Sequence, residues 1–350
     1  MTQVTSSANA PISLDLRVSG PWFTSTSFAA ATPNPDEGAK TLSGSVALRN
    51  AAWKPDFLAS PVDLGSATLR FENGLAIWDG VTFAYGPPAN RIRGTATLAM
   101  PLPCASGQLC TPHFTVRFTT LDLATLQQAL LGAHEPGTII SSFIDRFRPA
   151  TQLNWPAAQG TIQADSLTAG PFTFAGTSAH LQVESHGIKF TSLDARIFGG
   201  QIRGTASLAI PATQPAMPIY TLDASFTGIN PTPLSKVLGE KWAGGPISGS
   251  GTLKLSGFTP ADLASSALGA LNFDWRNGRI TRQPDQAADS SSQTEFTRWT
   301  GTAKIDKSAI TLGENKLQQS GGKPTKAEGS LTFAQQPKLT LITAPTNPQP

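Results

Sequence analysis

The segment Ala179-His180-Leu181-Gln182-Val183-Glu184 alternates apolar and polar side chains at every step. A period of two is typical of a β-strand with one apolar face and one wet face. The same alternation recurs in Ser13–Ser19, Ile92–Met100, Phe114–Thr119 and Leu271–Arg276. Pairs of turn-forming residues occur at short intervals along the chain: Asn73-Gly74, Asp79-Gly80, Gly199-Gly200 and Asn277-Gly278. The sequence therefore predicts a mainly β fold whose strands are mostly antiparallel.

Four short stretches have the periodicity of helices instead. They are Leu121–Leu131, Ile139–Phe147, Leu234–Leu238 and Pro260–Leu268. Thr259 directly precedes the fourth stretch, and threonine is a favoured N-cap residue. We expect these few helices to accompany the β structure rather than to form a domain of their own.

Composition and charge exclude some classes of protein. The chain has 350 residues, of which 14% are charged, against about 25% in an average soluble protein. The formal net charge is +3, which argues against a nucleic-acid partner, because such proteins concentrate basic residues in a patch. The sequence has no run of about 18 apolar residues, so it predicts no membrane-spanning helix.

The cysteines bear on the compartment. Met1–Pro11 is polar and does not resemble a signal peptide. The chain is therefore either cytoplasmic or part of a longer, exported protein. Cys104 and Cys110 lie in a proline-flanked loop and could form a disulfide in an oxidising compartment. Two solvent-facing thiols are the alternative, and both interpretations stay open at this point.

An internal repeat organises the chain. Ile92–Pro101 matches Ile202–Pro211 at eight of ten positions, with a shift of 110 residues. We infer a unit of strand hairpins, a further strand and a short helix, present twice in full and once in part. Such units stack along one direction. Gln283–Gln293 and Gly313–Lys326 are predicted to be polar loops, the second at a hairpin tip, and Thr343–Pro350 a frayed tail.

Three architectures can hold this many strands. Open sheets rarely exceed about ten strands without curling, splitting or closing. A split into packed sandwiches is favoured by the pattern alone. A closed outer-membrane barrel needs aromatic girdles, for which two tyrosines are few. A long trough, apolar inside and polar outside, has the same periodicity as a sandwich, so periodicity cannot separate these two.

The stretch Phe174–Ile280 resembles the C-terminal region of the AsmA-like family. The resemblance rests on an ordered series of motifs: Ile197–Gly204 with its Phe-Gly-Gly turn, Phe226–Asn230 with Leu234 and Leu238 following, Gly249–Gly257, and Leu271–Ile280 with its Asn-Gly-Arg-Ile ending. Weaker versions of these motifs extend the resemblance to about two thirds of the chain.

The resemblance implies a long curled antiparallel sheet, a β-groove of repeated hairpin units with a few short helices. It implies a periplasmic protein, anchored in the inner membrane by an N-terminal helix that this chain lacks. On this basis residues 1–150 form an upstream β-repeat region, residues 151–342 the AsmA-like C-terminal region, and residues 343–350 a disordered tail.

The sequence offers no set of residues for catalysis. Gly244–Gly251 is rich in glycine, but a strand rather than a helix follows it, so it indicates a turn and not a phosphate-binding loop. His180, Glu184 and His186 could share a strand face, but a turn at Ser185–Gly187 would break their register. We therefore expect no enzyme, no catalytic residue, no metal and no cofactor.

The resemblance implies that the groove carries phospholipid between the inner and outer membranes and supports outer-membrane assembly. Acyl chains need apolar burial and no hydrogen bonds, so apolar strand residues are the expected lining. They are Leu69, Phe71, Ile92, Leu98, Leu181, Val183, Ile202, Leu208, Leu253, Leu255, Leu271 and Phe273. The expected partners are phospholipid and the membranes at the ends of the full-length protein. The alternative function is a non-transporting envelope scaffold or adhesin.

Overall fold

The computed structural model describes residues 3–6, 13–19, 41–54, 58, 61–72, 74–86, 91–101, 110–131, 155–211, 217–281, 293–307, 309–332 and 338–343. Within them, nineteen strands form one sheet. The strands are β1 (Gln3–Ser6), β2 (Ser13–Ser19), β3 (Thr41–Lys54), β4 (Val62–Glu72), β5 (Leu75–Tyr85), β6 (Ile92–Pro101), β7 (His113–Asp122), β8 (Ala158–Ala169), β9 (Phe172–Glu184), β10 (Gly187–Ile197), β11 (Gly200–Ala209), β12 (Ile219–Ile229), β13 (Lys241–Gly244), β14 (Ile247–Ser256), β15 (Leu268–Thr281), β16 (Gln293–Asp306), β17 (Ala309–Gln318), β18 (Ala327–Thr332) and β19 (Lys338–Thr343).

From β3 to β19 the strands follow one another across the sheet in chain order, and nearly all neighbouring pairs are antiparallel. Two pairs of short strands lie end to end. β1 and β2 share one edge of β3, and β13 and β14 share one edge of β15. The pair β7–β8 is parallel. Parallel strands need a crossover connection, which is why a helix follows β7.

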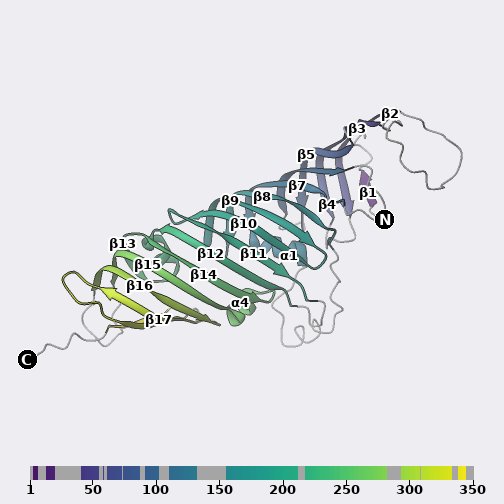
Figure 1. Ribbon diagram of the computed structural model, residues 1–350. Helices are drawn as coiled ribbons and strands as arrows, with labels where there is room; N and C mark the ends of the chain where they lie inside the picture. Colours follow the sequence, from purple (N-terminus) through teal and green to yellow (C-terminus); the bar gives the residue numbers. More distant parts are fainter. Residues whose placement is uncertain are drawn as a thin grey trace, which may run out of the picture.

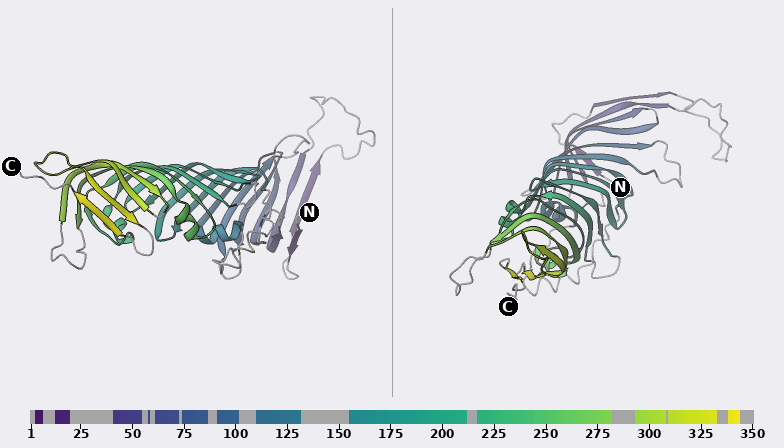
Figure 2. Two further views of the ribbon diagram at one scale, coloured as in Figure 1. Left: turned by 90° about the horizontal axis from the view of Figure 1, so that it is seen from below. Right: turned by 60° about the vertical axis from the view of Figure 1, so that its left-hand side comes forward.

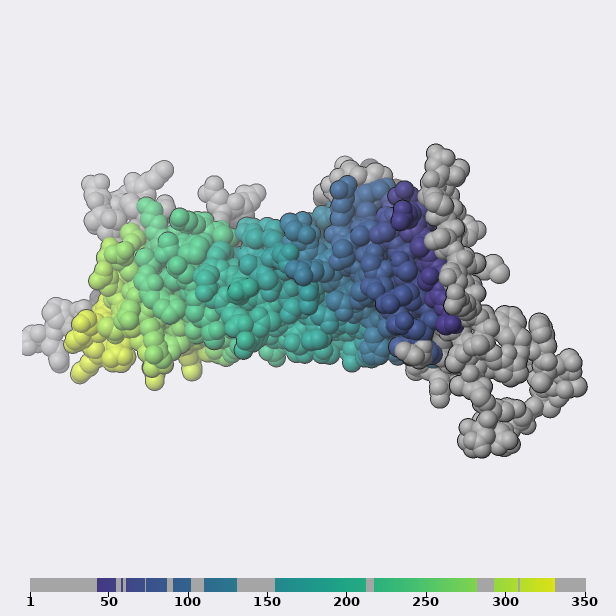
Figure 3. Space-filling model, turned by 90° about the horizontal axis from the view of Figure 1, so that it is seen from above, coloured from purple at the N-terminus to yellow at the C-terminus, as the bar shows by residue number. Residues whose placement is uncertain are grey.

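The sheet is long and curled and does not close on itself (Figures 1 and 2). In the space-filling view the strands succeed one another along the long axis from the N-terminal to the C-terminal end (Figure 3). The predicted fold class is therefore confirmed. The sandwich, which the pattern alone favours, is wrong, because the described strands belong to one sheet. That sheet also runs without a break from β7 to β8, on either side of the predicted boundary at residue 150.

Two of the predicted turns are wrong. Asp79-Gly80 lies inside β5 and Asn277-Gly278 inside β15. Gly80 and Asn277 have positive φ angles of 57° and 49°. The strand register shifts at Gly80, whereas β15 keeps its register with β16 across Asn277. A positive φ is used both within a strand and in a tight turn, so the same residues are compatible with either one. The turn at Gly199, with a φ of 78° between β10 and β11, is confirmed.

Three short helices occur in the described part of the chain: α1 (Leu123–Leu131), α3 (Pro231–Val237) and α4 (Pro260–Ser266). The Thr259 side chain accepts a hydrogen bond from the backbone N–H of Asp262, and the Asp262 side chain caps in return, which confirms the predicted N-cap. α3 begins after Asn230, whose side chain accepts from the N–H of Thr232. The Asp122 carboxylate accepts from the N–H of Thr125 at the start of α1.

Other predicted segments fall partly or wholly outside the described residues. The helix at Ile139–Phe147 lies outside them, as does Gln283–Gln293 up to its last residue and Thr343–Pro350 after its first. The predicted loop Gly313–Lys326 begins too early, because β17 continues to Gln318 before the chain turns.

Candidate functional site

One face of the sheet is apolar along almost its whole length. Cross-strand pairing places one apolar or glycine residue from each strand directly beside the next. We call this series the central row: Val46, Leu69, Trp78, Leu98, Phe114, Gly160, Leu181, Phe190, Ala206, Leu222, Leu253, Gly269, Ile305 and Ile310. Paired residues in a sheet point to the same face. The central row therefore crosses the sheet from β3 to β17 without a polar member.

A second row runs beside it, two residues away along most strands and three residues away along β5 and β10, where the register shifts. This second row consists of Val81, Ala96, Val116, Ile162, Ala179, Leu193, Gly204, Ala224, Gly251, Leu271, Ala303 and Leu312. Many of its members are alanine or glycine, so little side-chain volume rises from this part of the sheet. The two rows together form a wholly apolar strip.

The apolar face is the concave one. Helix α1 packs on it near β7 and β8 through Leu126, Ala129 and Leu130. The Gln127 amide of the same helix donates a hydrogen bond of 2.9 Å to the carbonyl of Phe258, which follows β14. A short helix that follows β7 can reach a residue that follows β14 when it lies on the inner side of the curve, where the strands converge.

Every predicted lining residue lies on this face. Leu69, Leu98, Leu181 and Leu253 belong to the central row and Leu271 to the second row. The other predicted residues lie an even number of positions from the central-row member of their own strand, and so point the same way. Most are half-buried, whereas Ile92 and Leu181 are buried. Their contact with lipid stays a prediction.

The two repeat units share the face but differ in register. Leu69 and Leu181, which begin the similar stretches Leu69–Glu72 and Leu181–Glu184, both lie in the central row. Leu98 is also in the central row, but its counterpart Leu208 lies two residues beyond Ala206, which takes the place in the row. Bulges at different points in β4, β5 and β10 account for this offset. A shift of two residues keeps the same face, whereas a shift of one would have inverted it.

The opposite face is polar. Gln182, Arg203, Thr205, Lys254 and Asn272 are all exposed there. Two carboxylates on this face, those of Asp194 and Asp274, accept hydrogen bonds from side chains of neighbouring strands.

The Arg298 guanidinium donates two hydrogen bonds of 3.0 Å to Asp274, and these hold the pKa of that carboxyl below its usual range. Hydrogen bonds from Gln201 and Arg203 likewise lower the pKa of Asp194. Ion pairs of this kind on an exposed sheet contribute little to the stability of the fold, but their charged groups keep the polar face hydrated.

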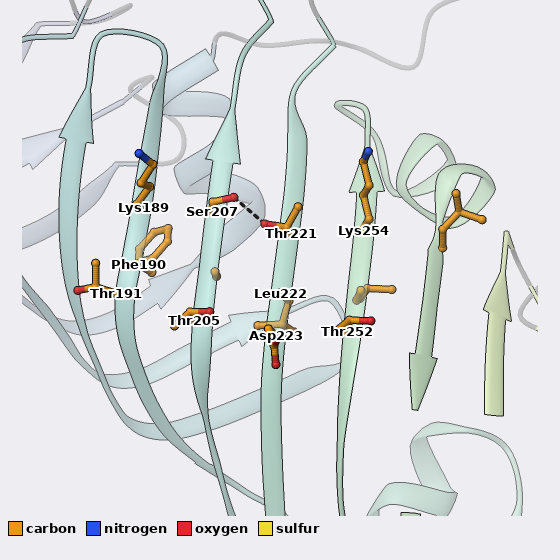
Figure 4. A pocket seen from close by; sticks show the side chains of 13 residues that line it. Lys189, Phe190, Thr191, Thr205, Ser207, Thr221, Leu222, Asp223, Thr252 and Lys254 are labelled. Atoms are coloured by element: carbon orange, nitrogen blue, oxygen red, sulfur yellow. Dashed lines mark hydrogen bonds between the residues drawn. The ribbon is translucent and has the colours of Figure 1, made fainter. Parts of the chain in front are cut away.

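A shallow hollow of about 610 Å³ lies over β10, β11, β12 and β14 (Figure 4). Two rows of residues from the polar face line it, one on each side of Phe190, Ala206, Leu222 and Leu253. The hollow therefore opens on the polar face. These rows are Lys189, Ser207, Thr221 and Lys254, and Thr191, Thr205, Asp223 and Thr252. The hydroxyls of Ser207 and Thr221 lie 2.6 Å apart and bond to each other. The lining contains no histidine or cysteine, and its polar groups do not form a nucleophile and base.

Aromatic side chains fill one long margin of the apolar face in its C-terminal half. The ring centroids of Trp275 lie 4.9 Å from those of Phe296 and 6.2 Å from those of Trp299. Trp242 of β13 packs against Trp275 at 5.7 Å. Trp275 is 3% exposed and donates from its indole N–H to the carbonyl of Gly245. This margin is a packed core, so the accessible strip is the central row and the second row beside it.

Glycines on the apolar face lie beneath aromatic rings. A Cβ on Gly94 would lie 2.9 Å from the ring of Phe83 and 3.0 Å from that of Phe118. A Cβ on Gly160 would lie 2.7 Å from the ring of Phe114, and one on Gly249 would lie 2.6 Å from that of Phe226. The rings therefore lie close against the sheet. Strand periodicity does not reveal these pairs, although a glycine inside a strand pattern is a known sign of close approach.

A few buried polar atoms on the apolar side have no hydrogen-bond partner among the described residues: Thr177 Oγ1, Tyr220 Oη and Trp242 Nε1. Burial raises the pKa of Tyr220 to about 12. Thr177 and Tyr220 lie outside the central and second rows. The apolar strip itself is free of them.

Of the two predicted disulfide residues, Cys110 is half-buried and disulfide-bonded. Cys104 lies outside the described residues, so the pairing itself stays a prediction. Among α1, α3 and α4, which are the helices of the described segments, none is long and apolar enough to cross a membrane. Comparisons with protein-family models, with curated proteins and with solved structures found no match for this chain.

Proposed function

We propose that this chain is an AsmA-like cell-envelope protein that holds phospholipid acyl chains on its concave apolar face. In this proposal it conducts phospholipid between the inner and outer membranes and so supports outer-membrane assembly. The full-length protein is periplasmic and attached to the inner membrane. The observation that supports the proposal best is the central row, which is apolar from Val46 to Ile310.

The dimensions of the strip suit this cargo. Strands lie about 4.8 Å apart, so the thirteen steps of the central row span roughly 60 Å along the sheet. Half of a bilayer hydrocarbon core is about 15 Å thick, which is the length of one acyl chain in a leaflet. The strip therefore has room for several chains, one after another.

The energetics also suit it. Each methylene moved from water to an apolar surface contributes about 0.8 kcal/mol, so even half of a sixteen-carbon chain contributes about 6 kcal/mol before the cost of ordering it. No hydrogen bond or charge is needed for this gain. A polar group in the strip would weaken it, because burying an unpaired polar group costs free energy.

The direct test is lipid bound to the protein. The full chain, expressed with export to the periplasm and purified without harsh detergent, is analysed by native mass spectrometry. We expect adducts with the masses of phospholipids, released on collisional activation. Transfer of a labelled diacyl phospholipid from donor vesicles to the protein gives the same information in solution. A chain that neither carries lipid nor accepts it from vesicles would refute the proposal.

A further inference from the structure

Helix α1 lies inside the curve of the sheet, over the apolar strip. Its residues Leu126, Ala129 and Leu130 belong to a cluster that also contains Val116 and Ile162. Val116 and Ile162 are members of the second row. The helix therefore sits where the strip passes from β7 to β8.

The near side of α1 is held firmly. Ala129 is 1% exposed. The Tyr85 hydroxyl donates a buried hydrogen bond of 2.6 Å to the carbonyl of Ala129, near the end of the helix. At the other end, Asp122 accepts from Thr125 at 2.7 and 2.8 Å and from the Thr168 hydroxyl at 2.9 Å. These contacts tie both ends of α1 to β5, β7 and β8.

The far side of α1 meets the opposite wall through a polar contact. Gln127 Nε2 donates to the carbonyl of Phe258 at 2.9 Å, and both groups are only partly buried. Phe258 lies in the turn between β14 and α4. Five strands, β8 to β12, lie between the two partners in the order of the sheet. This hydrogen bond therefore joins the two walls of the curve.

We propose that α1 is a gate on the lipid path and that the Gln127–Phe258 hydrogen bond is its latch. This rests on the function proposed above and adds a means of regulating it. With the latch closed, α1 and the β14–α4 turn hold the walls together above the strip. With the latch open, the helix stays on its near wall while the far wall moves away, and acyl chains pass.

The chemistry of the latch favours reversible opening. An amide and a backbone carbonyl that are partly buried exchange their mutual hydrogen bond for bonds to water when they separate, so the net loss is small. Buried apolar contacts on the near side have no such replacement. The two sides of α1 thus differ in how easily they release, and the far side releases first.

The test compares two adjacent glutamines. Gln128 is exposed, so Gln128→Ala is a matched control for Gln127→Ala. Each variant of the full chain is loaded with a pyrene-labelled diacyl phospholipid, and its release to acceptor vesicles is followed by fluorescence. Loss of one net hydrogen bond predicts release roughly two- to tenfold faster for Gln127→Ala, and unchanged release for Gln128→Ala.

Two further variants make the result decisive. Gln127→Asn keeps an amide but shortens the side chain, so it should release lipid as fast as Gln127→Ala. Gln127→Glu places a carboxylate against a carbonyl at neutral pH and should be at least as fast, with Gln128→Glu as its control. Hydrogen exchange of amides in the β14–α4 turn, which loses its contact with α1, should rise in the Gln127 variants and stay unchanged in both Gln128 variants.

The outcomes separate the two proposals. If the wild-type chain takes up no labelled lipid, the proposed function fails, while hydrogen exchange still shows whether the latch restrains the β14–α4 turn. If the wild type loads but the Gln127 and Gln128 variants release lipid alike, the gate is refuted. If Gln127→Asn and Gln127→Ala both unfold, the contact is a structural brace and the gate is refuted as well.

Discussion

Leu253 is the position at which the lipid path can be tested most directly. It lies in the central row between Leu222 and Gly269 and is half-buried. Its neighbour Thr252 is exposed on the polar face of the same strand. Leu253→Glu and Thr252→Glu therefore introduce the same charge, one residue apart, on opposite faces of the sheet.

The expected effect on lipid binding is large. A carboxylate in the strip keeps its water, so a bound acyl chain loses contact over about three or four methylenes. At about 0.8 kcal/mol each, this amounts to roughly 3 kcal/mol, or about 100-fold weaker binding. Thr252→Glu leaves the apolar face unchanged and should bind lipid within about twofold of the wild type.

The expected effect on stability is small. Full burial of a leucine side chain contributes about 1.5–3 kcal/mol, so its loss at a half-buried site costs about 1 kcal/mol. Titration with labelled phospholipid vesicles measures the binding, and urea unfolding followed by circular dichroism measures the stability. Unfolding of Leu253→Glu would refute the argument, because that is how a residue in a closed core behaves. Equal lipid binding by the two variants would refute it too.

Three further predictions concern the fold that carries the strip. Asn315→Leu should lower the free energy of unfolding by about 3 kcal/mol or more in urea titrations, because it leaves Trp299 Nε1 and both backbone groups of Ala327 without their partner. Gly94→Ala should cost about 1–3 kcal/mol in the same assay, since its Cβ would press on the ring of Phe83. Burial alone raises the pKa of Asp122, but hydrogen bonds from Thr125 and Thr168 lower it overall, below its ordinary value of 3.8. The wild type should therefore be more stable than Asp122→Asn above that value, and the difference should vanish as the pH falls through the lowered pKa.

Strand periodicity was enough to predict which residues share the apolar face. The alternation in Ala179–Glu184 or Leu271–Arg276 sets the face of each strand without knowledge of its neighbours. The caps of short helices were equally local, and Thr259 illustrates this. Each of these features depends on residues within one turn or one strand, so the local sequence is enough to predict it.

Pairing across the sheet was beyond the sequence pattern. The positive-φ sites at Gly80 and Asn277 use the same residues as tight turns, and whether the chain reverses there depends on how the neighbouring strand pairs. The choice between a sandwich and a curled sheet depends on what covers the apolar face, which alternation does not report. Contacts such as Gln127 with Phe258, 131 residues apart in sequence, depend on the curl itself.

The same curl explains how one sheet can have an accessible apolar strip without exposing a broad apolar surface. A flat apolar sheet of this length would expose a broad apolar face that favours aggregation. Here the aromatic margin around Trp275 is packed as a core, α1 and the β14–α4 turn meet above the strip, and the polar face is turned outward. What stays accessible is the narrow strip of apolar and glycine residues formed by the central row and the second row. A narrow path favours slender apolar molecules over folded partners, because a protein surface would need a broader area to bind with useful affinity. This geometry makes the acyl chain the cargo to test first.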